Sequence, residues 1–271
     1  MTASERNVTP EWRYRTRRGD LAVWASWLLG TMIVVLCMSF ISEKTIWIFV
    51  LSATQEAADL GSRMIPPDWP YILQLGRPMW DTFNIATLGT AIAIVISVPV
   101  AFCAARNTTP SATIVRPVAL FIIAASRSIN SLIWALLLVV IVGPGVFAGV
   151  LAIAFRSIGF CAKLLYEAIE EISVEPVEAV TATGASQAQI LGYGVVPQVL
   201  PAFAGISVFR WDINIRESTI LGLVGAGGIG LQLNASINNL DWSRVAVILV
   251  VILATVIVSE WLSAKIRAAL T

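Results

Sequence analysis

The feature that most limits the possible folds of this chain is a series of long apolar segments with few charged side chains. Residues 21–41 contain no charge, and a helix of that length crosses a hydrocarbon core about 30 Å thick. Four more such segments follow at 83–105, 117–142, 145–162 and 245–262. Another candidate, 199–224, is interrupted by four charged side chains: Arg210, Asp212, Arg216 and Glu217. The sequence therefore predicts an all-α, polytopic membrane protein with about six transmembrane helices.

Composition supports a lipid environment and excludes several functions. Apolar residues make up 57% of the chain and charged residues 13%, which leaves too little polar surface for a soluble domain. The net charge is +1 and no basic patch with interleaved aromatics occurs, so we expect no nucleic-acid partner. Histidine is absent, and the three cysteines lie in three different apolar segments: Cys37, Cys103 and Cys161. We therefore expect no metal site, no catalytic residue and no enzymatic activity.

Lysine and arginine are unevenly distributed between the two predicted sides of the membrane. With six crossings both termini share one side, and that side has ten basic residues near the membrane, against four on the other. The positive-inside rule then places both termini in the cytoplasm. The predicted segments are a cytoplasmic tail 1–20, a first transmembrane helix 21–42, an external segment 43–82, a membrane core 83–262 and a cytoplasmic tail 263–271.

Residues 166–198 form a predicted cytoplasmic loop that is too long and too regular for a simple connection. Apolar positions at helical spacing indicate that the fourth membrane helix continues into the cytoplasm until Pro176 breaks it. A short helix is predicted over 177–182, with Gly184 supplying a permissive backbone position at its end. Pro197 and Pro201 are expected to mark the turn back toward the membrane.

Residues 178–184, with Pro197 at the expected distance, resemble the EAA loop in membrane subunits of bacterial ATP-binding-cassette importers. Three positions depart from the usual pattern: Val180, Gly194 and Val196. The resemblance implies that this short helix sits in a groove of an ATPase subunit and transmits the closure of that subunit to the membrane helices. The implied coupling residues are Glu178, Ala179, Ala182, Gly184 and Pro197.

Further segments resemble the phosphonate-type subgroup of these importers. They are 127–130, 134–136, 147–152, 167–170, 193–198, 214–216, 218–222 and 224–230. The resemblance implies a type I importer permease fold in the bacterial inner membrane, and substrates such as phosphonate, phosphite or hypophosphite. It also implies several partners: two copies of an ATPase that holds ATP and Mg, a second permease subunit that is identical or paralogous, an external binding protein and membrane lipid.

Three arginines lie at a similar predicted depth in the membrane. Arg127, Arg156 and Arg210 are each about ten residues into a span, which is about 15 Å and close to the bilayer centre. Because each costs at least ~2.5 kcal/mol there, such side chains face a water-filled path, a substrate or a partner group. The structural alternative is pairing with backbone carbonyls or with an acid on another helix.

Polar side chains also recur at every second position from Arg210 to Arg216. In a helix Asp212 and Arg216 would pair at i and i+4, whereas in a broken or extended stretch all four would point the same way. The sequence leaves both arrangements open. The candidate substrate path comprises Arg127, Ser128, Asn130, Arg156, Arg210, Asp212, Asn214 and Arg216.

A glycine-rich segment, 225–230, matches the dinucleotide-binding fingerprint, but no strand precedes it and no P-loop occurs in the chain. We therefore expect no nucleotide or other cofactor in this chain, and ATP to be held by another subunit. The segment is interpreted as flexible backbone at the outer end of the fifth helix, at a gate or a binding-protein contact. The glycines concerned are Gly225, Gly227, Gly228 and Gly230.

Three other functions compete with a phosphorus-oxyanion importer. An importer of the same architecture could carry an amino acid or a quaternary amine, although aromatic cages without excess arginine would favour that substrate. An ion-coupled secondary transporter would require internal repeats, which are not evident. A membrane-embedded enzyme lacks a nucleophile and metal ligands.

Overall fold

The computed structural model of the protein describes residues 17–270, and every regular element in that range is helical. The chain divides into two units, residues 1–59 and 60–271. Among residues 17–270, five helices are long and apolar enough to cross a membrane, and a bent helix pair brings the number to six if it counts as one span. The expectation of an all-α protein with about six membrane helices is confirmed.

The first unit contains helix α1, Arg17–Lys44, and most of helix α2, Trp47–Met64. The apolar part of α1, residues 19–44, meets the length and composition required of a span. It extends the predicted 21–42 at both ends, because a helix continues through its charged flanks when nothing breaks it. The tail arginines at positions 6, 13 and 15 lie outside the described residues.

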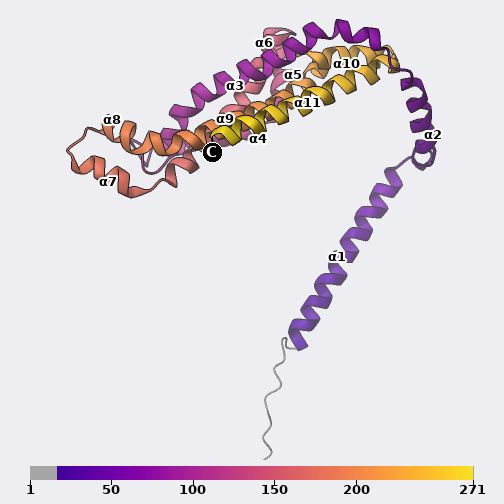
Figure 1. The fold of residues 1–271 in the computed structure, drawn as a ribbon. Coiled ribbons are helices and arrows are strands. Elements are labelled where there is room, and N and C mark those ends of the chain that lie inside the picture. The colour runs from indigo at the N-terminus through magenta and orange to yellow at the C-terminus, as the bar shows by residue number, and fades with distance from the viewer. Residues whose placement is uncertain (1–16, 271) are drawn as a thin grey trace, which may run out of the picture. The chain divides into compact units, whose positions relative to one another are not determined.

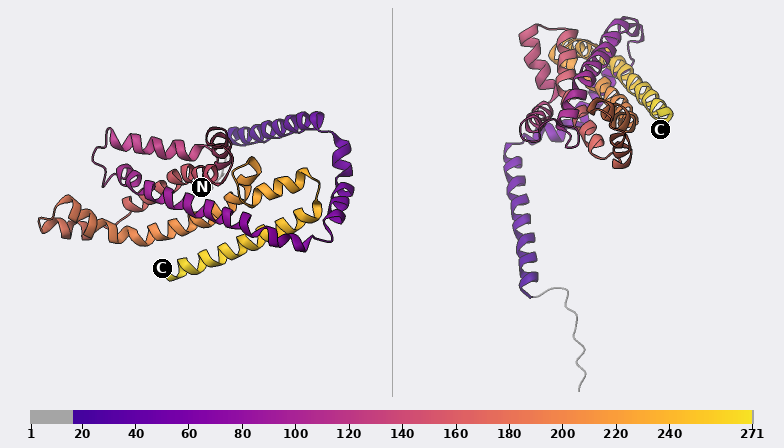
Figure 2. Two further views of the ribbon diagram at one scale, coloured as in Figure 1. Left: turned by 90° about the horizontal axis from the view of Figure 1, so that it is seen from above. Right: turned by 90° about the vertical axis from the view of Figure 1, so that its left-hand side faces the viewer.

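The second unit is a bundle of helices with short connections (Figure 1). Its elements are η1 (Trp69–Gln74), α3 (Gly76–Ala104), α4 (Val115–Ser128), α5 (Ser131–Val142), α6 (Val146–Glu170), α7 (Val174–Ala182), α8 (Gln187–Gln189), η2 (Ile190–Val195), α9 (Val196–Leu221), η3 (Gly222–Val224), α10 (Ile229–Asn238) and α11 (Trp242–Leu270). Within this unit α7 and α8 lie at one end and α10 at the other, in both Figure 1 and the left view of Figure 2. The predicted core boundary at residue 83 falls inside α3, because Trp80 and Asp81 do not interrupt a helix.

Helices α3 and α6 form the centre of this bundle, and small residues allow their close approach. The buried face of α3 includes Ala86, Gly89 and Ala93, which recur at helical spacing. A Cβ atom added at Gly89 would lie 2.6 Å from Ile153 Cγ2 and 3.0 Å from the Val150 carbonyl oxygen of α6. The two backbones therefore pack through a glycine, as is common between membrane helices.

Replacing Gly89 with alanine is therefore expected to destabilise the bundle by about 1–3 kcal/mol, because the Val150 backbone cannot move out of the way cheaply. Gly205 on α9 is the matched control, since a Cβ there meets nothing within 4 Å and alanine favours helix. Thermal unfolding of both variants in detergent, followed by tryptophan fluorescence, measures the difference. Equal stability of the two variants would contradict this account of the packing.

The third apolar segment is not one straight helix, contrary to the prediction over 117–142. Helices α4 and α5 meet at an angle of 89°, with Ile129 and Asn130 between them. The Asn130 side chain accepts a hydrogen bond from the Leu132 backbone N–H at 3.1 Å and so caps α5. An asparagine that caps a new helix competes with continuation of the preceding one, which explains the break.

Of the two arrangements that the sequence left open for residues 199–224, the structure has the continuous helix, because α9 runs unbroken from Val196 to Leu221. The sequence predicted that Pro197 and Pro201 mark the turn back toward the membrane. This prediction was wrong, because both prolines lie within α9. Pro197 lies in the first turn of α9, where the missing N–H costs nothing, and Pro201 lies inside the helix. The chain instead turns at residues 183–186, between α7 and α8.

Candidate coupling segment and transmembrane polar site

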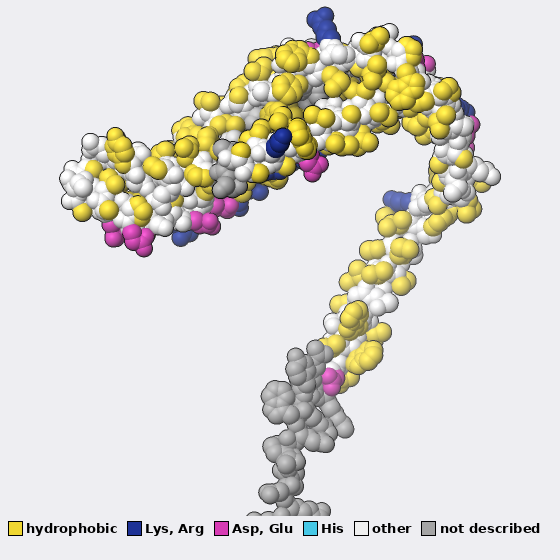
Figure 3. Space-filling view, viewed as in Figure 1, with side chains coloured by type: hydrophobic (Ala, Val, Ile, Leu, Met, Phe, Trp, Pro, Cys, Tyr) yellow, Lys and Arg dark blue, Asp and Glu magenta, His cyan; other side chains and the backbone are white. Residues whose placement is uncertain are grey.

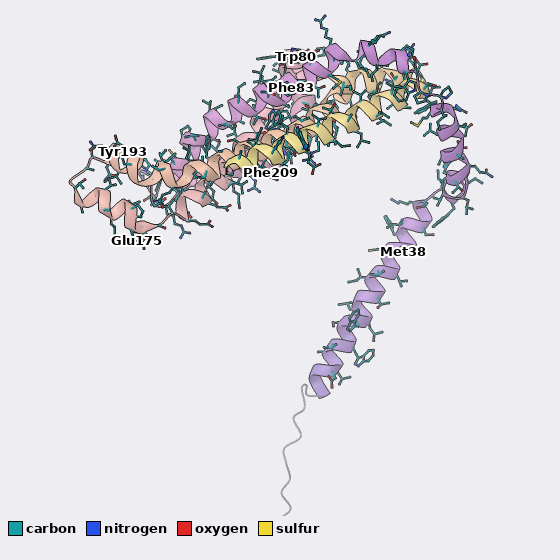
Figure 4. All side chains as sticks on the ribbon, viewed as in Figure 1. Met38, Trp80, Phe83, Glu175, Tyr193 and Phe209 are labelled. Carbon is teal, nitrogen blue, oxygen red and sulfur yellow. The ribbon has the colours of Figure 1, made fainter. Side chains whose placement is uncertain are left out.

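The predicted coupling loop is a short exposed helix held at one end of the second unit. Helix α7 has no buried residue, and its C-terminal turn contains Gly184 with a φ of +76°. This left-handed backbone confirms the predicted permissive position. Figure 3 shows acidic side chains gathered at this end of the unit, and Figure 4 labels Glu175 on α7 and Tyr193 on η2 there.

The base of this segment is tied to the membrane helices by hydrogen bonds. The Gln198 side chain accepts from the Ser173 N–H at 3.1 Å and donates to the Gly194 carbonyl at 2.7 Å. At the end of α6, Glu170 accepts from the Arg106 backbone N–H at 2.9 Å and lies 3.7 Å from the Arg116 guanidinium. The residue that precedes α7 is therefore bonded to α9, and the end of α6 is bonded to Arg106 and Arg116.

The structure brings only some of the predicted coupling residues together. Ala179 and Gly184 line a shallow pocket of about 650 Å³ that also contains Tyr193. Glu178 and Ala182 are exposed on the same helix, whereas Pro197 lies beyond the pocket on α9. The coupling role of all five remains a prediction.

A cluster of charged side chains lies among the helices, and its centre is a residue that the sequence interpretation left out of the site. Glu217 of α9 contacts Arg156 of α6, with Oε1 2.6 Å from the Arg156 Nη1. Its other oxygen lies 3.5 Å from the Nη2 of Arg210, two turns earlier on the same face of α9. Arg156 therefore pairs with an acid on another helix, which is the structural alternative considered above. The available signal was the spacing of seven residues between Arg210 and Glu217, which places both on one face of a helix.

Arg210 is anchored further by a buried network of uncharged groups. Its Nε donates to the Ser157 hydroxyl at 2.9 Å, and the Asn214 amide donates to Ser157 at 3.1 Å and to Thr90 at 2.7 Å. Arg210 is 2% exposed and Asn214 is fully buried. The network joins α3, α6 and α9, so it holds the Arg210 guanidinium in a defined position.

The predicted i, i+4 pair between Asp212 and Arg216 is present on α9. Asp212 also accepts a hydrogen bond from the Ser259 hydroxyl of α11 at 2.9 Å. The side chain of Asp212 is 4% exposed and that of Arg216 is 43% exposed. Asp212 is therefore satisfied by the protein, as Asn214 is.

The break between α4 and α5 places the N-terminus of α5 beside Arg156. The Ser131 hydroxyl, at the first residue of α5, lies 3.5 Å from the Arg156 Nη1. Helix N-termini carry partial positive charge, and broken membrane helices present such ends to anionic groups. Arg127, in the last turn of α4, is exposed and has no ion pair or hydrogen-bond partner among residues 17–270, and Ser128 bonds only locally. The structure thus does not bring Arg127 to the other two arginines.

The glycine-rich segment is a tightly packed turn and not the flexible backbone that the sequence suggested. Gly225, Gly227 and Gly228 all have positive φ, and the Gly225 carbonyl accepts from the Gly145 N–H at 3.0 Å. A Cβ at Gly228 would lie 2.6 Å from the Thr82 hydroxyl of α3. Gly230 is buried against the end of α9. Glycine is required at these positions because the backbone is left-handed or because another segment packs against it closely. The gate role of these glycines remains a prediction.

Metal chemistry finds no support in the described part of the chain. No group of three or more His, Cys, Asp or Glu side chains there is arranged to hold a metal ion. The site consists instead of guanidinium, carboxylate, hydroxyl and amide groups.

Comparison with known proteins gives consistent relatives. Residues 97–270 match the family described as "Binding-protein-dependent transport system inner membrane component". The phosphite transport system permease protein PtxC of Stutzerimonas stutzeri is 42% identical over 218 residues, covering 80% of this chain and 79% of that protein. The phosphate-import permease protein PhnE of Mycolicibacterium smegmatis is 42% identical over 223 residues, covering 81% of this chain and 42% of that protein.

A solved structure shares the fold at low sequence identity. One chain of the MetNI methionine ABC transporter, in an inward-facing conformation, superposes with a TM-score of 0.65 at 23% identity, covering 75% of this chain and 99% of that chain. The helical arrangement, the family match and the relatives all indicate a permease subunit. The chain therefore belongs to the inner-membrane components of binding-protein-dependent ABC importers.

Proposed function

We propose that this protein is the permease subunit of an ATP-driven importer for phosphite, a phosphonate or a related reduced phosphorus oxyanion. Its similarity to permeases named for phosphite transport, over most of both chains, supports this substrate class. The chain makes no covalent change to its substrate and alternates access between the two sides of the membrane. ATP and Mg are held by a separate ATPase subunit.

The observation that carries the proposal is the meeting of two membrane arginines around one carboxylate, beside the N-terminus of α5. Guanidinium remains charged at any physiological pH and presents paired donors to oxyanions. Two cations and one anion leave one positive charge in excess among the helices, where the low dielectric strengthens its attraction for an anion. Such a site suits a small oxyanion better than an amino acid or a quaternary amine.

Helix α7 supports a role as the coupling element. It has no buried residue, and Ser173, which precedes it, is hydrogen-bonded to Gln198 of α9, as a link between a cytoplasmic partner and the membrane helices requires. We propose that it docks on an ATPase subunit, with two such subunits serving a pair of permeases that is a homodimer or a dimer of paralogues. The opposite end of the second unit, around α10, would face an external binding protein (Figure 1).

The proposed topology places the protein in the bacterial inner membrane with both termini in the cytoplasm. With Cys37, Cys103 and Cys161 replaced, Asp59→Cys and Asn239→Cys are expected to react with an impermeant thiol reagent from outside. Gln187→Cys on α8 is expected to react only after the membrane is opened, because α8 belongs to the cytoplasmic segment. All three positions are exposed, so side-chain access does not limit the test. Labelling of Gln187→Cys in intact cells would contradict this topology.

The proposed substrate class can be tested with the assembled importer. Proteoliposomes containing the permease, its ATPase and its binding protein are expected to accumulate labelled phosphite or a phosphonate when ATP is supplied. Methionine and glycine betaine, offered with the same complex, test the amino-acid and quaternary-amine alternatives. Uptake of either of these without uptake of any phosphorus oxyanion would reject the proposed function.

A further inference from the structure

The Glu217 carboxylate lies between the guanidiniums of Arg156 and Arg210. One carboxylate oxygen contacts Arg156 at 2.6 Å, and the other contacts Arg210 at 3.5 Å. The two arginines belong to different helices, α6 and α9, and the N-terminal Ser131 of α5 lies beside Arg156. A phosphite or phosphonate group would bridge the two arginines in the same way, because two of its oxygens share one central atom and each can face a separate guanidinium.

The contact with Arg210 is incomplete. Arg210 is 2% exposed, and its Nη2 is buried without a hydrogen-bond partner. Glu217 Oε2 is likewise buried without one, although the two atoms are within ion-pair distance. A buried charged donor without a hydrogen bond is unfavourable. The Arg210 Nη2 group can therefore still donate a hydrogen bond to another acceptor. On the other side of Glu217, the Arg156 side chain is 31% exposed.

The charge of this cluster differs from that of its neighbour on α9. Asp212 and Arg216 form a balanced pair, and Asp212 has a further hydrogen bond from Ser259. By contrast, the single carboxylate of Glu217 is shared between two guanidiniums. The arrangement reduces the cost of holding two cations among the helices, and it leaves the cluster attractive to a second anion.

We propose that Glu217 is a resident counter-ion that substrate displaces as it passes between Arg156 and Arg210. This proposal rests on the proposed function and adds to it a residue that controls release of the substrate. An arriving oxyanion binds both guanidiniums, and the Glu217 side chain rotates away from them. When Glu217 pairs with the arginines again, the oxyanion dissociates. Because the competing carboxylate is tethered, it is always available at high local concentration. Tight retention is thereby prevented, as a transport pathway requires.

The test measures phosphite binding to the detergent-solubilised importer without its binding protein, together with ATP-driven phosphite uptake by the complete complex in proteoliposomes. Glu217→Gln removes the competing charge and keeps the side-chain size. It is expected to bind labelled phosphite roughly tenfold more tightly than the parent, because two guanidiniums then lack a counter-ion. Its turnover is expected to fall several-fold, because release becomes slow.

Two further variants control for folding and for charge. Glu217→Asp keeps the charge balance but shortens the side chain, so the carboxylate cannot reach both arginines at once. This variant is expected to bind phosphite more tightly than the parent, but by a smaller factor than Glu217→Gln. It is also expected to assemble even if Glu217→Gln does not. Glu260→Gln removes an exposed acid from α11 and is expected to match the parent in both measurements. Sulfate as competitor tests whether the site accepts tetrahedral oxyanions in general.

The outcomes separate this proposal from the proposed function. If the parent complex takes up no phosphorus oxyanion, the proposed function fails. If the parent takes up phosphite but the assembled Glu217 variants bind it no more tightly than the parent, Glu217 is only a structural ion-pair partner and the inference is overturned. Absence of measurable binding by the parent and by both Glu217 variants at millimolar phosphite would overturn it as well.

Discussion

Replacing Arg210 with glutamine is expected to reduce ATP-driven phosphite uptake by about two orders of magnitude. Arg210 is buried, hydrogen-bonded to Ser157 and paired with Glu217, so its loss removes the excess positive charge and leaves that carboxylate to Arg156 alone. Loss of one partner from a buried charge pair costs about 2–5 kcal/mol, and every 1.4 kcal/mol is tenfold. Uptake by proteoliposomes with matched amounts of assembled complex measures the effect.

Two further variants show whether charge or geometry matters at this position. Arg210→Lys is expected to restore little transport, because an ammonium group cannot bond Ser157 and face Glu217 with the same fork of donors. Arg77→Gln, at the exposed start of α3, controls for the loss of an arginine elsewhere and is expected to transport normally. The affinity of the binding protein for phosphite should not change in any variant. Uptake by Arg210→Gln at the parent rate would show that this arginine is structural.

Reversing the charge of Glu178 is expected to impair coupled transport strongly while leaving the membrane helices intact. Helix α7 has no buried residue, so Glu178→Lys removes no packing and acts on the surface offered to the ATPase. We expect phosphite uptake to fall at least about tenfold, and the stimulation of ATP hydrolysis by the loaded binding protein to disappear. Both quantities are measured in the same proteoliposomes.

Glu171→Lys provides the matched control for that variant. Glu171 is also exposed and acidic, but it follows the end of α6 and lies outside α7. The same charge reversal there is expected to leave coupling close to that of the parent. Equal uptake by the parent and the Glu178→Lys variant would remove α7 from the docking surface.

The sequence was sufficient wherever local patterns determine structure. Long apolar segments predicted the membrane helices, since only a helix satisfies its own backbone in lipid. The spacing of Asp212 and Arg216 predicted their pair once α9 proved continuous, and Gly184 predicted the left-handed end of the exposed helix. All three inferences depend on residues within one continuous segment of the chain, whose relative placement the helix geometry sets.

Tertiary structure alone decided which distant groups meet. Glu217 lies 61 positions from Arg156, and no local pattern brings a side chain of α9 to one of α6. The close packing of the glycine turn likewise depends on neighbours that are distant in sequence, Gly145 and Thr82. Charge in an apolar segment shows that a partner is needed, because an isolated charge is costly there. The packing of α6 against α9 determines which residue that partner is.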